Sequence, residues 1–453
     1  MQKVLPLIVS LFCCVFFYVV IWNRIPRTWT GSKELYTMVL KSGFFWRDKH
    51  EATEHVIPAT RTPSLSLSSR NTTKSAVKED VLDFLHHVKS HQEAPLGNHN
   101  LTTSVTILPV LYKKDFEKLP EWDFEDIYMR NNEERRPVCS KFLQKSEDEE
   151  FQAAIVPNIQ LWLHRGHLSI REWNRLSHFN NPFGFMEYKY NDVKSSVDLI
   201  PKPKYTQLLP VPESAHDGCI RCAVVGTGGI LSGSRKGKEI DSHHYVFRMN
   251  GAVTKGFEED VGNKTSVYVH TSYALVQSVY NLNTYGFRGA PNDEGIKYVL
   301  IPEGLRDFEW IQGLFKKTIV RKGDFKGIRP LRFYGRRVEK EKFYVLHPDF
   351  LRYIRNRFLR SANLNDEFWH IYRPTNGAFT LFLALHTCDI VNVYGFITED
   401  HHKYFNYYFD QGVKTSVVFF INHDYNLEIQ TWKKLHDSGI INLYQRKENL
   451  KET

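Results

Sequence analysis

Residues 222–250 read CAVVGTGGILSGSRKGKEIDSHHYVFRMN, and they carry the clearest indication of the fold class. Its apolar run 223–225 stops at a glycine-rich turn, which predicts a short buried strand. A second predicted strand, 245–249, ends at Asn250. Gly226, Gly228 and Gly229 have no Cβ atoms, so we expect the backbone of the turn to approach a ligand closely. Because ligands of parallel α/β sheets bind at the carboxyl ends of strands, the stretch predicts a nucleotide site.

Predicted strands and helices alternate through the rest of the C-terminal part of the chain. Further strands are expected at residues 266–269, 298–301, 343–346 and 390–394. Helices are expected between them, at residues 273–279, 308–315, 350–359 and 377–385, with a short helix earlier at 168–174. This alternation predicts an α/β fold with a Rossmann-like, mostly parallel twisted sheet flanked by helices.

The N-terminal part of the 453-residue chain predicts a membrane anchor and a tether. Residues 4–22 carry no charge and are long enough for one membrane-spanning helix after a cytoplasmic tail of residues 1–3. A cleaved signal peptide is the alternative, although its apolar core is usually only about 7–15 residues long. Residues 23–135 include a Ser-, Thr- and Pro-rich stretch at 58–78 and predict a flexible stem. Residues 136–453 are expected to form one domain, which is large enough to be a catalytic domain.

Charge and cysteine content narrow the class of protein. The formal net charge is +9, but no long run of like charges occurs, so nucleic acid is not the expected partner. Four cysteines outside the apolar run allow three disulfide pairings: Cys139, Cys219, Cys222 and Cys388. The CxxC at 219–222 is also a pattern of zinc and redox sites. Because no second CxxC or zinc-finger histidine pair accompanies it, a disulfide framework in an oxidising compartment is favoured. Sequons predict glycosylation at Asn71, Asn100 and Asn263.

Four motifs follow one another over the C-terminal half. Residues 222–262 are followed by YRPTNG at 372–377 with Cys388 and YGF at 394–396, then by YYFD at 407–410 and HDYNLE at 423–428. In this order they resemble the L, S, third and H-x4-E (VS) sialylmotifs of the animal sialyltransferases, which transfer sialic acid from CMP-sialic acid to a sugar. LHPDFLRY at 346–353, YGFITE at 394–399 and WKKLHDSGII at 432–441 resemble the GalNAc α2,6-sialyltransferase subgroup. The resemblance does not cover the stem.

The resemblance carries implications for fold, disulfides and reaction. It implies a GT-A-like variant of the Rossmann-like fold and a disulfide between the L- and S-motif cysteines, Cys222–Cys388, which leaves Cys139–Cys219 as the second pair. It also implies inverting transfer to the 6-hydroxyl of GalNAc O-linked to Ser or Thr of mucin-type glycoproteins. The expected partners are CMP-sialic acid and a glycoprotein carrying GalNAc or galactosyl-GalNAc, and no metal or other cofactor is expected.

The resemblance further assigns roles to individual residues. His423 is expected to be the general base, and an imidazole that titrates near neutral pH suits this task. Glu428 and Tyr407 are the other expected catalytic residues. Helix N-termini bind phosphate groups, and hydrogen-bond donors there can meet the charge on the departing phosphate. The residues expected to bind the donor are Gly226, Thr227, Gly228, Asn250, Thr375, Asn376, Gly377 and Ile397.

Two positions depart from the pattern and leave alternatives open. Thr227 stands where many family members have Asn, and a hydroxyl offers one donor where the amide offers two N–H groups. Tyr407 stands where many members have His, and a phenol is the poorer acid at neutral pH. A membrane-anchored CMP- or glycan-binding protein without catalysis is therefore the alternative to an enzyme. A dinucleotide-dependent oxidoreductase is disfavoured, because Asn250 stands where an acidic residue would bind the ribose.

The anchor, the sequons and the resemblance together predict where the protein resides. We expect a single-pass type II glycoprotein of the Golgi membrane whose catalytic domain lies in the lumen.

Overall fold

The computed structural model describes residues 106–132, 143, 146–204, 207–335, 338–410 and 415–446. The chain divides into two units, Met1–Lys74 and Ser75–Thr453, and all described residues belong to the second. The predicted anchor at 4–22, most of the predicted stem, the sequons at Asn71 and Asn100, and Cys139 lie outside the described residues. Within these ranges, no helix is both long enough and apolar enough to cross a membrane.

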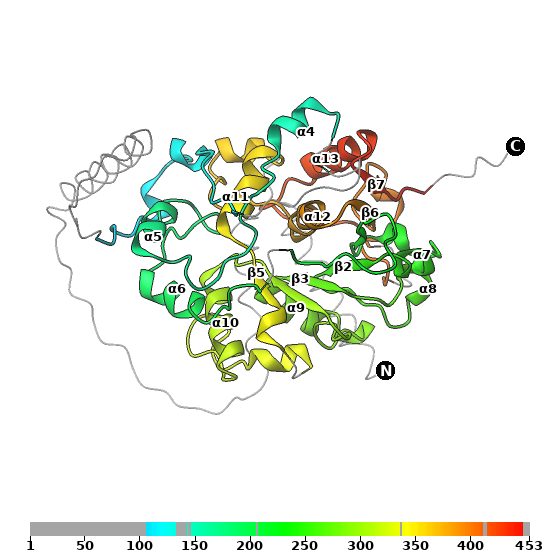
Figure 1. The fold of residues 1–453 in the computed structure, drawn as a ribbon, viewed down its shortest axis with the longest axis horizontal. Helices are drawn as coiled ribbons and strands as arrows, with labels where there is room; N and C mark the ends of the chain where they lie inside the picture. The colour runs from blue at the N-terminus through cyan, green and yellow to red at the C-terminus, as the bar shows by residue number, and fades with distance from the viewer. Residues whose placement is uncertain are drawn as a thin grey trace, which may run out of the picture. The chain divides into compact units, whose positions relative to one another are not determined.

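The described part of the chain forms one parallel sheet of seven strands in the order β5-β4-β3-β2-β1-β6-β7 (Figure 1). The strands are β1 Arg221–Val225, β2 Tyr245–Met249, β3 Val267–His270, β4 Lys297–Leu300, β5 Phe343–Val345, β6 Ile390–Tyr394 and β7 Ile441–Leu443. The predicted parallel α/β sheet is therefore confirmed, and β2 and β6 have the predicted bounds. Strand β7 is an addition that the sequence analysis does not predict.

Strand β1 lies at the point where the strand order reverses. Val224 of β1 is paired with Phe247 of β2 on one side and with Val393 of β6 on the other. The chain adds β2 to β5 on the first side of β1 before it crosses to add β6 and β7 on the second. In open α/β sheets such a reversal leaves a crevice outside the carboxyl ends of the two central strands, where ligands bind.

Helices cover both faces of the sheet (Figure 1). Cys222 and Val224 of β1 belong to the apolar cluster that includes side chains of α11, α12 and α13, whereas Ala223 and Val225 belong to the cluster that includes α9 and α10. Successive side chains of a strand point to opposite faces, so β1 is apolar from Cys222 to Val225 because both of its faces are buried there. The helices are α4 Glu149–Ala154, α5 Ile170–Leu176, α6 Tyr190–Val197, α7 Gly237–Asp241, α8 Glu258–Val261, α9 Ser272–Asn281, α10 Leu305–Phe315, α11 Pro348–Arg357, α12 Asn376–Thr387 and α13 Tyr425–Asp437.

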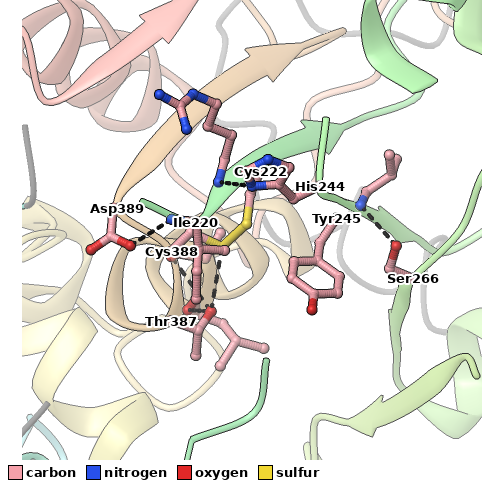
Figure 2. The surroundings of a disulfide bond; sticks show 12 residues. Ile220, Cys222, His244, Tyr245, Ser266, Thr387, Cys388 and Asp389 are labelled. Carbon is pink, nitrogen blue, oxygen red and sulfur yellow. Dashed lines mark hydrogen bonds between the residues drawn. A yellow bond between two sulfur atoms is a disulfide. The ribbon is translucent and has the colours of Figure 1, made fainter. Parts of the chain in front are cut away.

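Helix α12 is the central helix of the site-bearing face. It contacts β1, β2, β3 and β6, and nearly all its side chains are buried. Thr375 caps its N-terminus by accepting a hydrogen bond from Ala378 N. At its other end, Cys388 forms a disulfide with Cys222 of β1, as the family resemblance implies (Figure 2). The N-terminus of α12 is thereby held at the carboxyl edge of the sheet.

Candidate active site

A cavity of about 350 Å³ lies at the carboxyl ends of β1, β2 and β6, at the reversal of strand order. The residues that sequence analysis assigns to catalysis and donor binding all line this one cavity. They are Gly226, Thr227, Gly228, Asn250, Thr375, Asn376, Gly377, Ile397, Tyr407, His423 and Glu428.

The glycine-rich turn after β1 packs against the turn after β6. Gly226 N donates to Tyr394 O over 2.8 Å, and Gly228 N donates to Gly395 O over 2.9 Å. A Cβ atom on either Gly226 or Gly228 would lie 2.6 Å from Gly395 O. These glycines therefore make room for a neighbouring loop of the protein, and both also line the cavity, where close approach of a ligand stays a prediction.

Asn250 and Asn376 form a pair on the cavity wall. Asn376 Nδ2 donates to Asn250 Oδ1 over 2.8 Å, and Tyr268 Oη donates to the Asn250 carbonyl over 2.5 Å. Asn250 has a φ of +51°, a left-handed conformation that Asn tolerates better than most residues. Since the Asn250 oxygen is used inside the protein, its amide nitrogen is the group it presents as a donor to a ligand.

Glu428 joins the N-termini of α12 and α13. Its two carboxylate oxygens accept hydrogen bonds from Thr375 N and Thr375 Oγ1, both over 2.8 Å. The side chain is only 3% exposed, and this burial raises its pKa to about 7 despite the two bonds. Because both oxygens are occupied by Thr375, the arrangement suits Glu428 to positioning the α12 N-terminus.

His423 lies directly before α13 with its ring anchored at one nitrogen. Nδ1 lies 2.8 Å from the carbonyl oxygen of Arg373, which has no proton to give, so Nδ1–H is the donor and Nε2 is unprotonated. Burial, followed by the charge of Arg373, lowers the pKa of His423 to about 3. This pKa lies below the near-neutral value that the sequence analysis expects, so the imidazole is suited to act as a neutral hydrogen-bond acceptor at physiological pH.

Arg373, whose carbonyl oxygen holds His423, is itself held by an ion pair with Glu303. Arg373 Nη2 forms an ion pair with Glu303 over 2.5 Å, and its Nη1 donates to Asn376 Oδ1 over 3.1 Å. Sequence analysis assigns no role to either residue. Arg373 lies inside the S-like motif, and Glu303 follows β4 at the same edge of the sheet as Asn250, so position at a strand end is the signal that would have found Glu303.

The third motif closes the cavity over the glycine turn. Tyr407 is paired with Gly228 in an isolated bridge, and Tyr408 N donates to the Thr227 carbonyl over 3.2 Å. The Tyr407 ring is stacked on Phe409 at a centroid distance of 4.9 Å. Burial raises the pKa of Tyr407, so its phenol stays protonated at neutral pH and is suited to donating a hydrogen bond.

The cysteines and the remaining sequon lie away from this cavity. Cys219 is disulfide-bonded and Cys222 pairs with Cys388, so the disulfide interpretation of the CxxC holds over the zinc one; the predicted partner Cys139 lies outside the described residues. Asn263 is exposed in the loop that enters β3, at the edge of the sheet opposite the cavity. Among the described residues, no cluster of three His, Cys, Asp or Glu side chains is placed to hold a metal ion.

The fold and the cavity define an α/β protein with a ligand site at the sheet's switch point, and comparison with known proteins gives the family. Residues 162–440 match the model of glycosyltransferase family 29 (sialyltransferase). The chain belongs to this family.

Individual relatives agree with this assignment. "Alpha-N-acetylgalactosaminide alpha-2,6-sialyltransferase 1" of Gallus gallus is 44% identical over 348 residues, which are 76% of this chain and 61% of the relative. The Mus musculus protein of the same name is 40% identical over 403 residues, 88% of this chain and 75% of the relative. "Alpha-N-acetylgalactosaminide alpha-2,6-sialyltransferase 2" of Mus musculus is 38% identical over 360 residues, 76% of this chain and 96% of the relative. A solved chain titled "Crystal Structure of a Mammalian Sialyltransferase" aligns with a TM-score of 0.48 and 24% identity over 69% of this chain and 100% of that chain.

Proposed function

We propose that the protein transfers sialic acid from CMP-sialic acid to the 6-hydroxyl of GalNAc O-linked to Ser or Thr of mucin-type glycoproteins, with inversion at the sialic acid carbon. The observation that carries the proposal is the placement of His423, with Nδ1 anchored and Nε2 unprotonated, in the same cavity as the residues expected to bind the donor. The names of the relatives at 38–44% identity support the choice of acceptor sugar and hydroxyl.

The N-terminus of α12 is suited to the phosphate of CMP. The backbone N–H groups of Asn376 and Gly377 belong to its first turn, where no carbonyl of the same helix is available to them. Asn250 presents its amide nitrogen to the same cavity. These donors would stabilise the negative charge that develops on the departing phosphate, and Glu428 would hold the helix end in place through Thr375.

The acceptor hydroxyl requires a base, and His423 supplies one. Nε2 would take the proton from O6 of GalNAc as the O6–C2 bond to sialic acid forms. The bond from C2 to the phosphate oxygen breaks at the same time, and CMP leaves with the electron pair. The Arg373 carbonyl that accepts from Nδ1–H would stabilise the imidazolium formed in this step. The phosphate is already a stabilised leaving group, so we propose that no metal ion takes part.

We further propose that the protein is a single-pass type II protein of the Golgi membrane with a lumenal catalytic domain. The uncharged run at 4–22 and the disulfide between Cys222 and Cys388 support this location.

The test is a transfer assay with the full-length protein. A GalNAc-bearing Ser/Thr peptide and CMP-sialic acid are incubated in EDTA, and the product is weighed by mass spectrometry. One sialic acid mass per GalNAc is expected, and His423→Ala should remove it. CMP binding without any mass gain would contradict transferase activity and support the binding-protein alternative that Thr227 invites.

A further inference from the structure

Four consecutive large apolar side chains are exposed beside the cavity. Val418, Phe419, Phe420 and Ile421 are 54%, 46%, 54% and 42% exposed. These residues form the exposed run 418–421. Such side chains are normally scattered singly over a protein surface, and a contiguous group marks a binding surface.

The exposed run is continuous with the cavity wall. Val418 and Phe420 line the cavity, and Phe419 is stacked on Tyr425, another cavity-lining residue, at a centroid distance of 4.6 Å. The Phe420 carbonyl accepts a hydrogen bond from His423 N over 3.1 Å. The run is therefore joined directly to His423, the proposed base, and two of its side chains face the same cavity.

The backbone beside the run lies outside the helices and strands of the described residues. Residues 415–420 belong to no helix or strand, and the backbone groups of 416–419 make no backbone hydrogen bond to another described residue. Backbone groups that are not used in this way can pair with an extended peptide, whose side chains then lie against neighbouring apolar groups.

The absence of charged residues from the run also favours a peptide as its ligand. Residues 415–421 read TSVVFFI and carry no charge, whereas attraction to an anionic lipid surface depends on basic residues. The polypeptide around an O-glycosylated Ser or Thr is itself extended and weakly charged when it is rich in Ser, Thr and Pro.

We propose that the exposed run 418–421 is the docking surface for the polypeptide that carries the acceptor GalNAc. This inference rests on the proposed function, because it assigns the aglycone side of that acceptor. The enzyme would then recognise both parts of a glycopeptide. The sugar enters the cavity, and the peptide backbone on either side of the glycosylated residue lies along the run.

Two acceptors and a matched pair of variants test the inference. The full-length wild type, the double variant Phe420→Ser/Ile421→Ser and the control Ile319→Ser are assayed on a GalNAc-peptide and on GalNAc α-methyl glycoside. Ile319 has an exposed fraction of 47%, similar to the 42% of Ile421, and it does not line the cavity. The ratio of kcat/KM for glycopeptide to kcat/KM for methyl glycoside should fall about tenfold in the double variant, because two apolar contacts with the peptide are lost. The control should keep the wild-type ratio.

An unchanged ratio in the double variant overturns the inference, including the case in which both acceptors lose activity equally and the run belongs to the sugar site. A double variant that keeps the ratio but no longer co-sediments with anionic vesicles also overturns it, in favour of a membrane surface. Anisotropy of a labelled GalNAc-peptide in the presence of CMP measures docking without turnover, and the double variant should bind about tenfold more weakly than the control. If wild type transfers to neither acceptor, the proposed function fails, and anisotropy still decides the docking surface.

Discussion

The pH dependence of catalysis gives a quantitative test of His423 as a neutral base. Burial and the charge of Arg373 lower its pKa to about 3. An ordinary imidazole with a pKa of about 6.5 is about 9% neutral at pH 5.5 and about 91% neutral at pH 7.5. With a pKa of about 3, His423 is more than about 99% neutral at both values. The predicted change in active base between pH 7.5 and pH 5.5 is thus negligible, against about tenfold for an ordinary histidine.

Glu428 must be separated from His423 in this experiment, because burial raises its pKa to about 7. Glu428→Gln removes that titration, although it also exchanges one acceptor for an amide nitrogen opposite Thr375 and should lower kcat. The assay is kcat/KM for CMP-sialic acid at saturating acceptor, from pH 5.0 to pH 8.0, for wild type and Glu428→Gln. His423→Gln should lower kcat by about 10²–10⁴-fold, the usual contribution of a general base.

The expected result is that any inflection near pH 7 in wild type is absent from Glu428→Gln, whose profile is level down to pH 5. A tenfold fall between pH 7.5 and pH 5.5 in both proteins would show instead that His423 titrates as an ordinary imidazole does, and the lowered pKa would be wrong.

Three further predictions concern stability and modification. His347 is fully buried, and its Nδ1 accepts a hydrogen bond from Asp349 N. Burial lowers the pKa of His347 to about 3. The neutral imidazole therefore contributes to the free energy of unfolding above pH 6.5, and this contribution is lost as the pH falls towards 3. His347→Asn keeps a good capping residue, and the loss of unfolding free energy between pH 7.5 and pH 5.5 should be about 1.4 kcal/mol smaller than in wild type by urea titration; an equal loss would contradict the assignment. Replacing Cys222 and Cys388 by Ala removes a cross-link between residues 166 apart and should lower the free energy of unfolding by about 2–5 kcal/mol, unlike a conservative surface change. When the protein is expressed in animal cells, Asn263→Gln should lower its mass by one N-glycan and leave transfer unchanged, because Asn263 lies at the edge of the sheet opposite the cavity. Loss of transfer in a folded variant would contradict that placement.

The sheet is predictable from sequence where local signals are strong. Strands β2 and β6 are mostly apolar and end directly before Asn250 and Gly395, which mark their limits. Strand β7 has three residues, too few for a periodic pattern. Helix α13 is missing from the predicted helices although it carries usable signals: Asp424 caps it, and Ile429, Trp432 and Leu435 lie on its buried face.

The membership of the site is predictable from motifs, whereas its electrostatics are not. Sequence motifs bring His423, Glu428 and the α12 N-terminus to one cavity, because the carboxyl ends of parallel strands share one edge. The lowered pKa of His423 depends on burial and on Arg373, which only the folded chain brings to it. The link from Arg373 to Glu303 joins residues 70 apart in sequence, and no local pattern indicates it.

The central claim is that this cavity delivers O6 of GalNAc to sialic acid. A pair of glycopeptides, identical except that one carries 6-deoxy-GalNAc, tests it most directly when each is incubated with full-length protein and CMP-sialic acid and then weighed. We expect the mass of one sialic acid on the GalNAc peptide and none on the 6-deoxy peptide. Sialylation of the 6-deoxy peptide, or of neither, would contradict it.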